Sequence, residues 1–394
     1  MTVAVLGLGY VGLPVVRAFA EAGARVVGID VDPKRVHELA AQLTTDEEGL
    51  DSAFRNGALR VTTKAEALGD ADVVFICVPT PFEDGLARHQ AVQDCASAFS
   101  RHGRAHALVI LESTVRPGFL VELQTLLGHG GCVALAYAPE RVDPQPRGGQ
   151  RLIREIPRLV AGIDPDAEAR AVQVLSFVGV SAHPVPLAVA EYAKLLENAF
   201  RLLNVAFIDE FASLCRRDGV DPRAVVRAAA TKPFGFHPFW PGAGAGGHCV
   251  AVDPAFLAES GRRRGSALPL LEAALAANAR RPLQLAGEVA ARTAPGATVL
   301  VVGLTYKAGV ADTRESAALV VARTLRGMNR RVLTFDSLVH APSDLESVDL
   351  VQGLGRADAV VLLVPQPTAV VARLVGCGLP LFDATGSIAD AVEL

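Results

Sequence analysis

The sequence predicts an α/β protein in which two doubly wound parallel-sheet domains are joined by a helical middle domain with a long central helix. Short apolar runs alternate with helical stretches in residues 1–184 and again in 292–394, as in parallel sheets covered on both faces. Residues 185–291 lack this strand pattern and contain one long helical stretch. The fragments Val3–Leu8 and Leu300–Leu304 are similar, which indicates that the two outer domains are related.

The first domain is expected to alternate strands and helices. A β-branched run opens the chain, a glycine-containing turn follows it, and a helical pattern over 11–22 ends at Gly23. Helical stretches lie between most of the predicted strands, which is the order of a doubly wound sheet. The strands are expected at 2–6, 25–30, 59–63, 72–78, 107–111 and 132–137.

The middle domain is expected to be helical. Glu191–Arg217 has the periodicity of one long helix that Gly219 ends, and Asp221-Pro222 is a good start for the next helix. Residues 232–253 are rich in glycine, proline and aromatic residues, so a loop is expected there. The last domain is expected to have strands at 298–303, 331–335 and 357–364 and a helix at 315–326.

The composition is that of a globular protein with sizeable cores. The chain has 394 residues, of which 51% are hydrophobic and 20% are charged. The formal net charge of −4 and the lack of a long Lys/Arg run argue against a nucleic-acid partner. Pro14, Arg17 and several glycines interrupt the apolar N-terminus, so neither a membrane span nor a secretory leader is expected. The cysteines lack CxxC or zinc spacing, which predicts reduced thiols in a cytoplasmic protein without a metal site.

Gly7-x-Gly9-x-x-Gly12 stands between the first strand and the first helix. Gly7 allows the tight turn, Gly9 lets the backbone approach a pyrophosphate, and Gly12 permits close packing of helix on strand. The helix N-terminus would then face the phosphates with N–H groups and the positive end of its dipole. Asp30 ends the second strand, where a carboxylate accepts hydrogen bonds from a ribose and repels a 2′-phosphate. The pattern predicts a Rossmann-like domain that prefers NAD to NADP, although two basic residues follow Asp30 closely.

Cys249 lies in a glycine loop, with His248 beside it and Asp253 four residues later. A structural cysteine is usually found in an apolar helix or strand, whereas this setting is typical of a reactive thiol. Zinc binding would need more ligands than the loop offers. Cys249 is therefore the candidate nucleophile, and the side chain of His248 is expected to point elsewhere.

Polar residues on the long helix are further candidates. Lys194 and Asn198 are four residues apart, and Arg201 follows on the same face, so a cation and an amide could meet an oxyanion. The alternative is a set of solvated surface charges.

Other polar residues follow apolar strands, at the edge where open parallel sheets bind ligands. Ordinary capping of strand ends is the alternative for each of them. These residues are Thr80, Ser113, Thr114, Glu140 and Arg141.

Seven motifs run nearly end to end along the chain. They are the glycine motif with Tyr10-Val11-Gly12-Leu13-Pro14, Pro79-Thr80-Pro81, Ser113-Thr114-Val115-x-Pro117-Gly118, Pro139-Glu140-Arg141, Glu191-x-x-Lys194-Leu195-x-Glu197-Asn198-x-x-Arg201, Gly246-Gly247-His248-Cys249, and Gly303-Leu304-x-Tyr306-Lys307 with Arg314-Glu315-Ser316. In this order they resemble the nucleotide-sugar 6-dehydrogenases, such as the UDP-glucose, GDP-mannose and UDP-N-acetylhexosamine dehydrogenases. The chain departs from the family pattern at 82–92, where an expected Asp-Leu is missing, at 144–147, and at Ala251, where many members have proline.

The resemblance implies an NAD-binding domain at 1–184, a dimerising helical domain at 185–291 and a UDP-sugar-binding domain at 292–394. The dimer would be a homodimer formed through the long central helix. Contacts with NAD are implied for Gly7, Gly9, Tyr10, Val11, Gly12, Asp30, Thr80, Ser113 and Thr114. Contacts with the sugar nucleotide are implied for Glu140, Arg141, Lys194, Asn198, Arg201, Phe239, Gly242, Gly246, Gly247, Lys307 and Arg314.

The family oxidises a C6 alcohol to a carboxylate with two NAD, and the resemblance implies the same reaction here. Cys249 would attack the aldehyde and pass through a thiohemiacetal to a thioester. Lys194 and Asn198 would stabilise the oxyanion, and Asp253 would act with an ordered water as the base for the alcohol. The thioester would be hydrolysed by a water that is positioned and activated by the remaining two catalytic residues, Glu140 and Thr114.

The segment from His248 to Asp253, with Phe236–Gly242 before it, resembles the UDP-N-acetylhexosamine branch of the family. Its aromatic residues could pack on an acetamido methyl, and a pocket of that shape would bind UDP-glucose poorly. UDP-N-acetylmannosamine or UDP-N-acetylglucosamine is therefore the expected substrate, with UDP-glucose and GDP-mannose as alternatives. Two other functions are alternatives. A two-electron hydroxyacid dehydrogenase would need no thiol at its site, and a catalytically silent NAD-binding scaffold would need none of Cys249, Lys194, Asn198 and Asp253.

Overall fold

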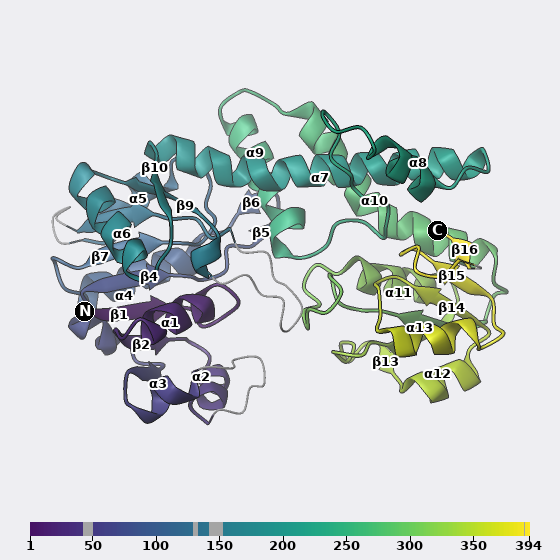
Figure 1. Cartoon of the computed structure of the whole chain (residues 1–394), viewed down its shortest axis with the longest axis horizontal. Helices are drawn as coiled ribbons and strands as arrows, with labels where there is room; N and C mark the ends of the chain where they lie inside the picture. Colours follow the sequence, from purple (N-terminus) through teal and green to yellow (C-terminus); the bar gives the residue numbers. More distant parts are fainter. Residues whose placement is uncertain (42–49, 129–132, 142–152, 390) are drawn as a thin grey trace. The chain divides into compact units, whose positions relative to one another are not determined.

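The structure, a computed structural model, forms two compact units, Met1–Leu196 and Glu197–Leu394. Each unit contains a largely parallel sheet with helices on both faces, which confirms the predicted α/β class with two Rossmann-like sheets (Figure 1). The division between the units falls inside the long helix, and the predicted limits of three domains stay a prediction. The residues described are 1–41, 50–128, 133–141, 153–389 and 391–394.

Among the described residues, the sheet of the first unit has eight strands in the order β10-β9-β8-β7-β4-β1-β2-β3. Neighbouring strands are parallel except β8 and β9. The sequence prediction omits β9 and β10, because an arginine opens β9 and a proline closes β10, which a strand pattern disfavours. The strands are β1 (Thr2–Leu6), β2 (Arg25–Ile29), β3 (Leu59–Thr62), β4 (Val73–Ile76), β7 (Leu108–Leu111), β8 (Ala134–Tyr137), β9 (Arg158–Gly162) and β10 (Ala182–Pro184).

Helices cover both faces of this sheet, and alternate residues of β1 belong to two separate apolar cores. Asp32 and Asp164 cap two of the helices, and a proline follows each cap. A short hairpin of β5 (Phe82–Glu83) and β6 (Leu86–Ala87) occupies the segment that departs from the family pattern. The helices are α1 (Gly12–Glu21), α2 (Pro33–Ala40), α3 (Asp51–Arg55), α4 (Gln90–His102), α5 (Phe119–Leu126) and α6 (Pro165–Phe177).

The long helix α7 (Leu187–Arg217) begins in the first unit and ends in the second. The second unit continues with α8 (Pro222–Ala229), α9 (His248–Arg263) and α10 (Pro269–Ala291). Among the described residues, its sheet is wholly parallel, in the order β13-β12-β11-β14-β15-β16. Its strands and helices are β11 (Thr298–Val302), α11 (Ala317–Gly327), β12 (Arg331–Phe335), β13 (Glu346–Ser347), α12 (Leu350–Arg356), β14 (Ala359–Leu362), α13 (Thr368–Val375), β15 (Leu381–Asp383) and β16 (Val392–Glu393).

The likeness of the two sequence fragments extends to their structure. The backbone N–H of Leu8 is accepted by Asp30 at 2.8 Å, and that of Leu304 by Asp336 at 2.7 Å. The glycine before each leucine has a positive φ, +92° for Gly7 and +87° for its counterpart. In each unit, the turn after its first strand in the chain, β1 or β11, is therefore tied to an aspartate that follows the neighbouring strand.

The loop expected at 232–253 is shorter than predicted, because α9 begins at His248. Glycines up to Gly247 and a proline at 254 favour a loop in the sequence, yet Pro254 lies within the helix. Gly247, with a φ of +79°, ends the irregular segment. Cys249 and Asp253 therefore lie on a helix and not in a loop.

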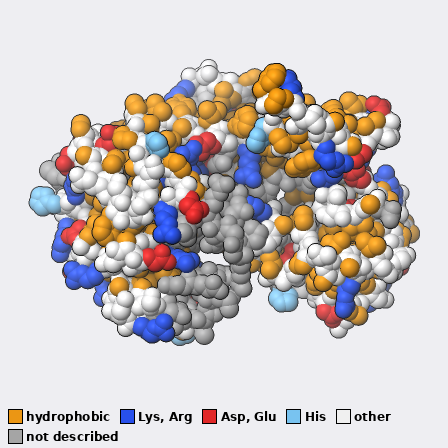
Figure 2. Space-filling model, in the orientation of Figure 1, with side chains coloured by type: hydrophobic (Ala, Val, Ile, Leu, Met, Phe, Trp, Pro, Cys, Tyr) orange, Lys and Arg blue, Asp and Glu red, His pale blue; other side chains and the backbone are white. Residues whose placement is uncertain are grey.

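The surface carries charges of both signs. On the face drawn in Figure 2, acidic and basic side chains are interspersed. No helix in the described part of the chain combines the length and apolar character that a membrane crossing requires. Residues 144–147, which depart from the family pattern, and Cys132, in a predicted strand, lie outside the described residues.

Candidate active site

The glycine turn of the first unit has the geometry that a pyrophosphate needs. A Cβ on Gly7 would lie 2.6 Å from the carbonyl oxygen of Cys77, and one on Gly12 would collide with the carbonyl oxygen of Gly7. A Cβ on Gly9 would meet nothing within 4 Å, so packing within the fold does not explain that glycine. Open space at the start of α1 fits the close approach of a dinucleotide.

Asp30 holds this turn from the end of β2. Its carboxylate accepts the N–H of Leu8 at 2.8 Å and that of Asp32 at 3.0 Å. Each oxygen has a second lone pair, so ribose hydroxyls can still donate to it. Arg35 donates its Nε–H to the carbonyl oxygen of Leu8 at 3.0 Å and so braces the turn. Of the other predicted residues in the turn, Val11 is half-buried and Tyr10 is exposed.

The remaining predicted cofactor residues follow β4 and β7. Thr80 is buried and Thr114 is half-buried. Ser113 donates its hydroxyl to the carbonyl oxygen of Val78 at 2.7 Å, which ties the ends of the two strands together. Ser113 therefore has a structural task at the strand ends in addition to its predicted contact.

A buried group of charges surrounds Glu140 in the first unit. Lys194 is 5% exposed and donates from Nζ to the carbonyl oxygen of Glu140 at 2.6 Å, so the solvated-surface alternative for Lys194 is wrong. The carboxylate of Glu140 lies 3.9 Å from Nη2 of Arg158. Nη1 of the same guanidinium lies 3.4 Å from the carboxylate of Glu112. One buried cation is thus shared by two carboxylates.

Sequence reasoning missed Glu112 and Arg158. Burial raises the pKa of Glu112 to about 7, against the opposite effect of Arg158. The available signal was a charged residue at the edge of an apolar run, since Glu112 directly follows β7 and Arg158 opens β9. Arg141, which was predicted to bind substrate, donates to the carbonyl oxygen of Pro157 at 3.0 Å.

The candidate nucleophile belongs to the second unit. Cys249 is exposed in the first turn of α9, where the positive end of the helix dipole stabilises a thiolate. Asp253 lies one turn further along and is 1% exposed. It accepts a hydrogen bond of 2.6 Å from Nδ2 of Asn198 on α7. The predicted base and the predicted amide donor are therefore direct partners.

A pocket of about 350 Å³ lies at the carboxyl ends of β11, β14 and β15 in the second unit. The strand order reverses between β11 and β14, which is where open α/β sheets bind their ligands. Its lining includes Gly242, Gly246 and Lys307 among the predicted substrate residues. Trp240, which also lines the pocket, belongs to the aromatic segment 236–242 that was predicted to pack on the sugar. The lining residues that sequence reasoning missed include Arg223, Thr305 and Thr385.

The other predicted substrate residues of the second unit lie outside the described lining of this pocket. A Cβ on Gly247 would lie 2.6 Å from the ring of Tyr306, so that glycine permits close packing of the loop. Arg201 is exposed, and Phe239 is half-buried. Arg314 pairs with Asp312 at 2.8 Å.

Family models of three consecutive domains match this chain. They are the NAD binding domain at residues 1–175, the central domain at 188–280 and the UDP binding domain at 300–370 of one family. The protein is accordingly an NAD-dependent nucleotide-sugar dehydrogenase. It belongs to the UDP-glucose/GDP-mannose dehydrogenase family.

Relatives and solved structures agree with this assignment. The chain is 34% identical to a UDP-N-acetyl-D-mannosamine dehydrogenase of Pyrococcus horikoshii, over 93% of this chain and 90% of the relative. It is 31% identical to an NDP-N-acetyl-D-galactosaminuronic acid dehydrogenase of Ralstonia solanacearum, over 92% and 90%. A solved UDP-D-ManNAc dehydrogenase from P. horikoshii superposes with a TM-score of 0.87 at 30% identity, covering 99% of this chain and 96% of that one. A UDP-glucose dehydrogenase from Pyrobaculum islandicum gives 0.85 at 30% identity, covering 97% and 94%.

Proposed function

We propose that this chain catalyses the four-electron oxidation of the C6 hydroxymethyl group of a UDP-sugar to a carboxylate, in the cytoplasm, with a UDP-N-acetylhexosamine as substrate. The observation that carries the proposal is the exposed Cys249 at the start of α9, one turn before the buried Asp253. Oxidation of an alcohol to an aldehyde needs no thiol, whereas a nucleophilic thiol allows the aldehyde to be oxidised further as a thioester.

The proposed reaction comprises two oxidations and a hydrolysis. Asp253, with an ordered water, takes the proton of the C6 hydroxyl while hydride leaves the carbon, which gives the aldehyde. Sγ of Cys249 adds to the aldehyde carbon and forms a thiohemiacetal, and loss of a second hydride and a proton gives the thioester. Water then cleaves the S–C bond, which releases the carboxylate and restores the thiol. Bound NAD supplies the hydride acceptor, so two NAD are reduced for each sugar.

Four other residues stabilise charge or position water in this scheme. The buried ammonium of Lys194 stabilises negative charge that develops on the reacting oxygen. Asn198 has a second N–H on Nδ2 besides the one that Asp253 accepts, and it acts in the same way. Glu140 and Thr114 position the hydrolytic water, and the guanidinium 3.9 Å from Glu140 orients its carboxylate.

Three observations support an acetamido sugar as the substrate. The segment His248–Asp253 resembles that branch of the family, and several relatives are named as dehydrogenases of N-acetylated sugars. Trp240 in the pocket wall offers an aromatic surface for an acetamido methyl. UDP-glucose and GDP-mannose remain the alternatives within the family, and a catalytically silent scaffold is the alternative outside it.

A substrate panel tests the proposal. The protein is incubated with NAD and one of UDP-N-acetylmannosamine, UDP-N-acetylglucosamine, UDP-glucose or GDP-mannose, and NADH absorbance and the sugar product are measured. We expect two NADH and one carboxylate per sugar, with the highest kcat/KM for an acetamido sugar. One NADH per sugar with aldehyde accumulating would contradict the thioester route. A higher kcat/KM for UDP-glucose or GDP-mannose would contradict the substrate, and no NADH with any sugar would favour the scaffold.

We also propose a homodimer formed through α7. Apolar side chains are exposed along this helix at spacings of three, four and seven residues, namely Val189, Tyr192, Leu196, Phe200, Phe207 and Leu214. Burial of such a stripe against a second copy removes apolar surface from water.

Phe207, with 65% of its surface exposed, is the residue to test. Phe207→Glu is expected to convert the dimer to a monomer in light scattering, because a carboxylate would be buried in the interface. Val121→Glu, at a similarly exposed apolar position on α5, is the matched control and should leave the mass unchanged. A monomeric wild-type chain would contradict the dimer.

A further inference from the structure

The loop that borders the second-unit pocket is held by polar side chains from the helices behind it. Asn278 on α10 accepts the N–H of Ala245 at 2.7 Å and donates to the carbonyl oxygen of Ala245 at 3.0 Å. Arg223 on α8 donates to the carbonyl oxygen of Pro241 at 2.6 Å. The irregular backbone of this loop thus finds its partners in side chains rather than in a regular element.

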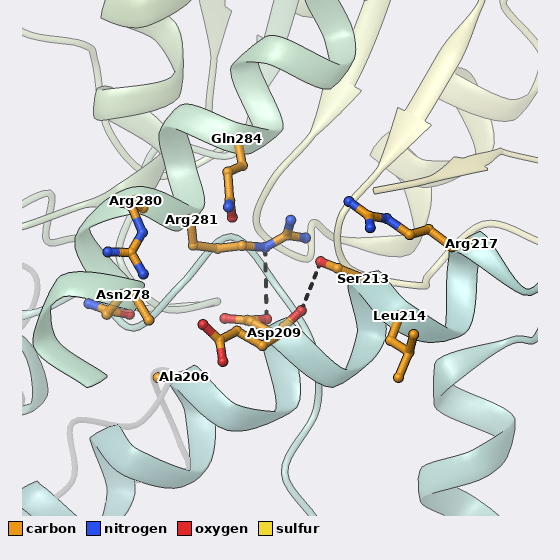
Figure 3. Close-up of a pocket in the computed structure, with 11 residues that line it drawn as sticks. Ala206, Asp209, Ser213, Leu214, Arg217, Asn278, Arg280, Arg281 and Gln284 are labelled. Carbon is orange, nitrogen blue, oxygen red and sulfur yellow. Dashed lines mark hydrogen bonds and ion pairs between the residues drawn. The ribbon is translucent and has the colours of Figure 1, made fainter. Parts of the chain in front are cut away.

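A pair of opposite charges makes the third contact, on Gly242. Asp209 on α7 accepts the N–H of Gly242 through Oδ1 at 2.8 Å, and Arg281 on α10 donates its Nε–H to the carbonyl oxygen of Gly242 at 3.0 Å. The two charged groups lie 4.0 Å apart, with the guanidinium of Arg281 above the carboxylate in Figure 3. One glycine is therefore held at both of its backbone polar groups.

Burial of the Asp209–Arg281 pair carries a large desolvation penalty. Asp209 is 3% exposed and Arg281 is 2% exposed. Among the described residues, Oδ2 of Asp209 and both terminal nitrogens of Arg281 lack a hydrogen-bond partner, although Nη1 lies 3.7 Å from Glu288. The two side chains form part of the wall of a cavity of about 240 Å³ between α7 and α10. An apolar pair of the same size often stabilises a protein as well as a buried ion pair does, so stability alone does not account for these charges.

We propose that Asp209 and Arg281 are positioning residues for the sugar nucleotide. Gly242 lines the pocket together with Trp240 and Pro241. By fixing the N–H and the carbonyl of Gly242 from behind, the pair sets the shape of that wall, although neither residue lines the pocket itself. This inference rests on the proposed function, because it assumes that the pocket takes the UDP moiety.

Two double variants of the full chain separate the hydrogen bonds from the charges. In D209N/R281Q, Oδ1 and Nε2 replace the Asp209 and Arg281 atoms that bond Gly242, so both bonds can form without charge. In D209L/R281M, the side chains have similar size but cannot form either bond. The dissociation constant of UDP is measured by calorimetry, together with that of NAD, the KM for the sugar nucleotide, kcat and the melting temperature.

We expect D209N/R281Q to bind UDP within about threefold of the wild type. D209L/R281M should bind it at least about tenfold more weakly, or about 1.4 kcal/mol, with a parallel rise in KM. NAD affinity should change less than about threefold in both double variants, because the glycine turn belongs to the first unit. The kcat should also change less than about threefold, because neither Asp209 nor Arg281 takes part in the proposed chemical steps. R280M is the matched control, since Arg280 is exposed and lines the same cavity but makes no bond to Gly242 among the described contacts.

Wild-type affinity for UDP in D209L/R281M would overturn the positioning role. Equal weakening in the two double variants would overturn it as well, because the hydrogen bonds would then make no difference. Equal weakening in R280M would show that any change at this cavity has the same effect, which also contradicts the role. A wild-type chain that did not bind UDP would overturn the proposed function, and the positioning role with it.

Discussion

Replacing Cys249 with serine is expected to lower steady turnover of the sugar nucleotide by roughly 10⁴-fold or more, the scale on which loss of a covalent nucleophile is felt. A serine hydroxyl at the N-terminus of α9 is a far weaker nucleophile than a thiol at the same place. NAD affinity should stay unchanged, because the glycine turn that is predicted to bind NAD belongs to the first unit. NADH formation at saturating substrate and NAD titration measure the two quantities.

Cys377→Ser is the matched control for this variant. Cys377 is a half-buried cysteine of the second unit and does not line the pocket. Its replacement should leave turnover within about threefold of the wild type. If Cys249→Ser kept turnover within tenfold and still produced the carboxylate, the thioester would not be an intermediate of the reaction.

Replacing Lys194 with alanine is expected to lower kcat by about 10²–10³-fold, or about 3–4 kcal/mol, with a much smaller change in KM. The ammonium is buried and is held by the carbonyl oxygen of Glu140 at 2.6 Å, so its charge acts in a site with little solvent screening. A charge that acts on the developing oxyanion affects the transition state more than the bound ground state. Initial rates across sugar-nucleotide concentrations separate kcat from KM.

Lys64→Ala removes an exposed lysine of the same unit and serves as the control. It should leave both constants unchanged, because a solvated charge contributes little. A rise in KM with kcat unchanged in Lys194→Ala would make Lys194 a binding residue and would remove it from the chemistry. Retention of NAD binding in the variant shows that the first unit has kept its fold.

The elements that local patterns specify could be predicted from the sequence. The turn at Gly7–Gly12 and the long helix depend on glycine positions and on periodicity within a short stretch of chain. The strand β9 depends on tertiary contacts, because the buried Arg158 at its start is paired with the carboxylates of Glu112 and Glu140. Glu140 lies 18 residues and Glu112 lies 46 residues before Arg158 in the chain, and no local pattern reveals such partners.

The start of α9 is a similar case. The run of glycines and the proline at 254 favour an irregular segment, and only the position of Gly247 against Tyr306 ends the loop there. Placing Cys249 on a helix changes the electrostatics around its sulfur. The identity of the candidate nucleophile was therefore predictable, whereas its setting was not.

The sequence by itself determined which residues of this protein are candidates for catalysis or binding. It identified the dinucleotide turn with Asp30, the thiol of Cys249 and the polar face of the long helix with Lys194, because these depend on residue type and short spacing. The tertiary structure alone decided which groups are buried and which are partners. It buried Lys194, joined Asn198 to Asp253, and placed Asp209 and Arg281 on either side of Gly242. The physical reason is that burial and hydrogen bonding depend on contacts between segments far apart in the chain, and folding alone brings those segments together.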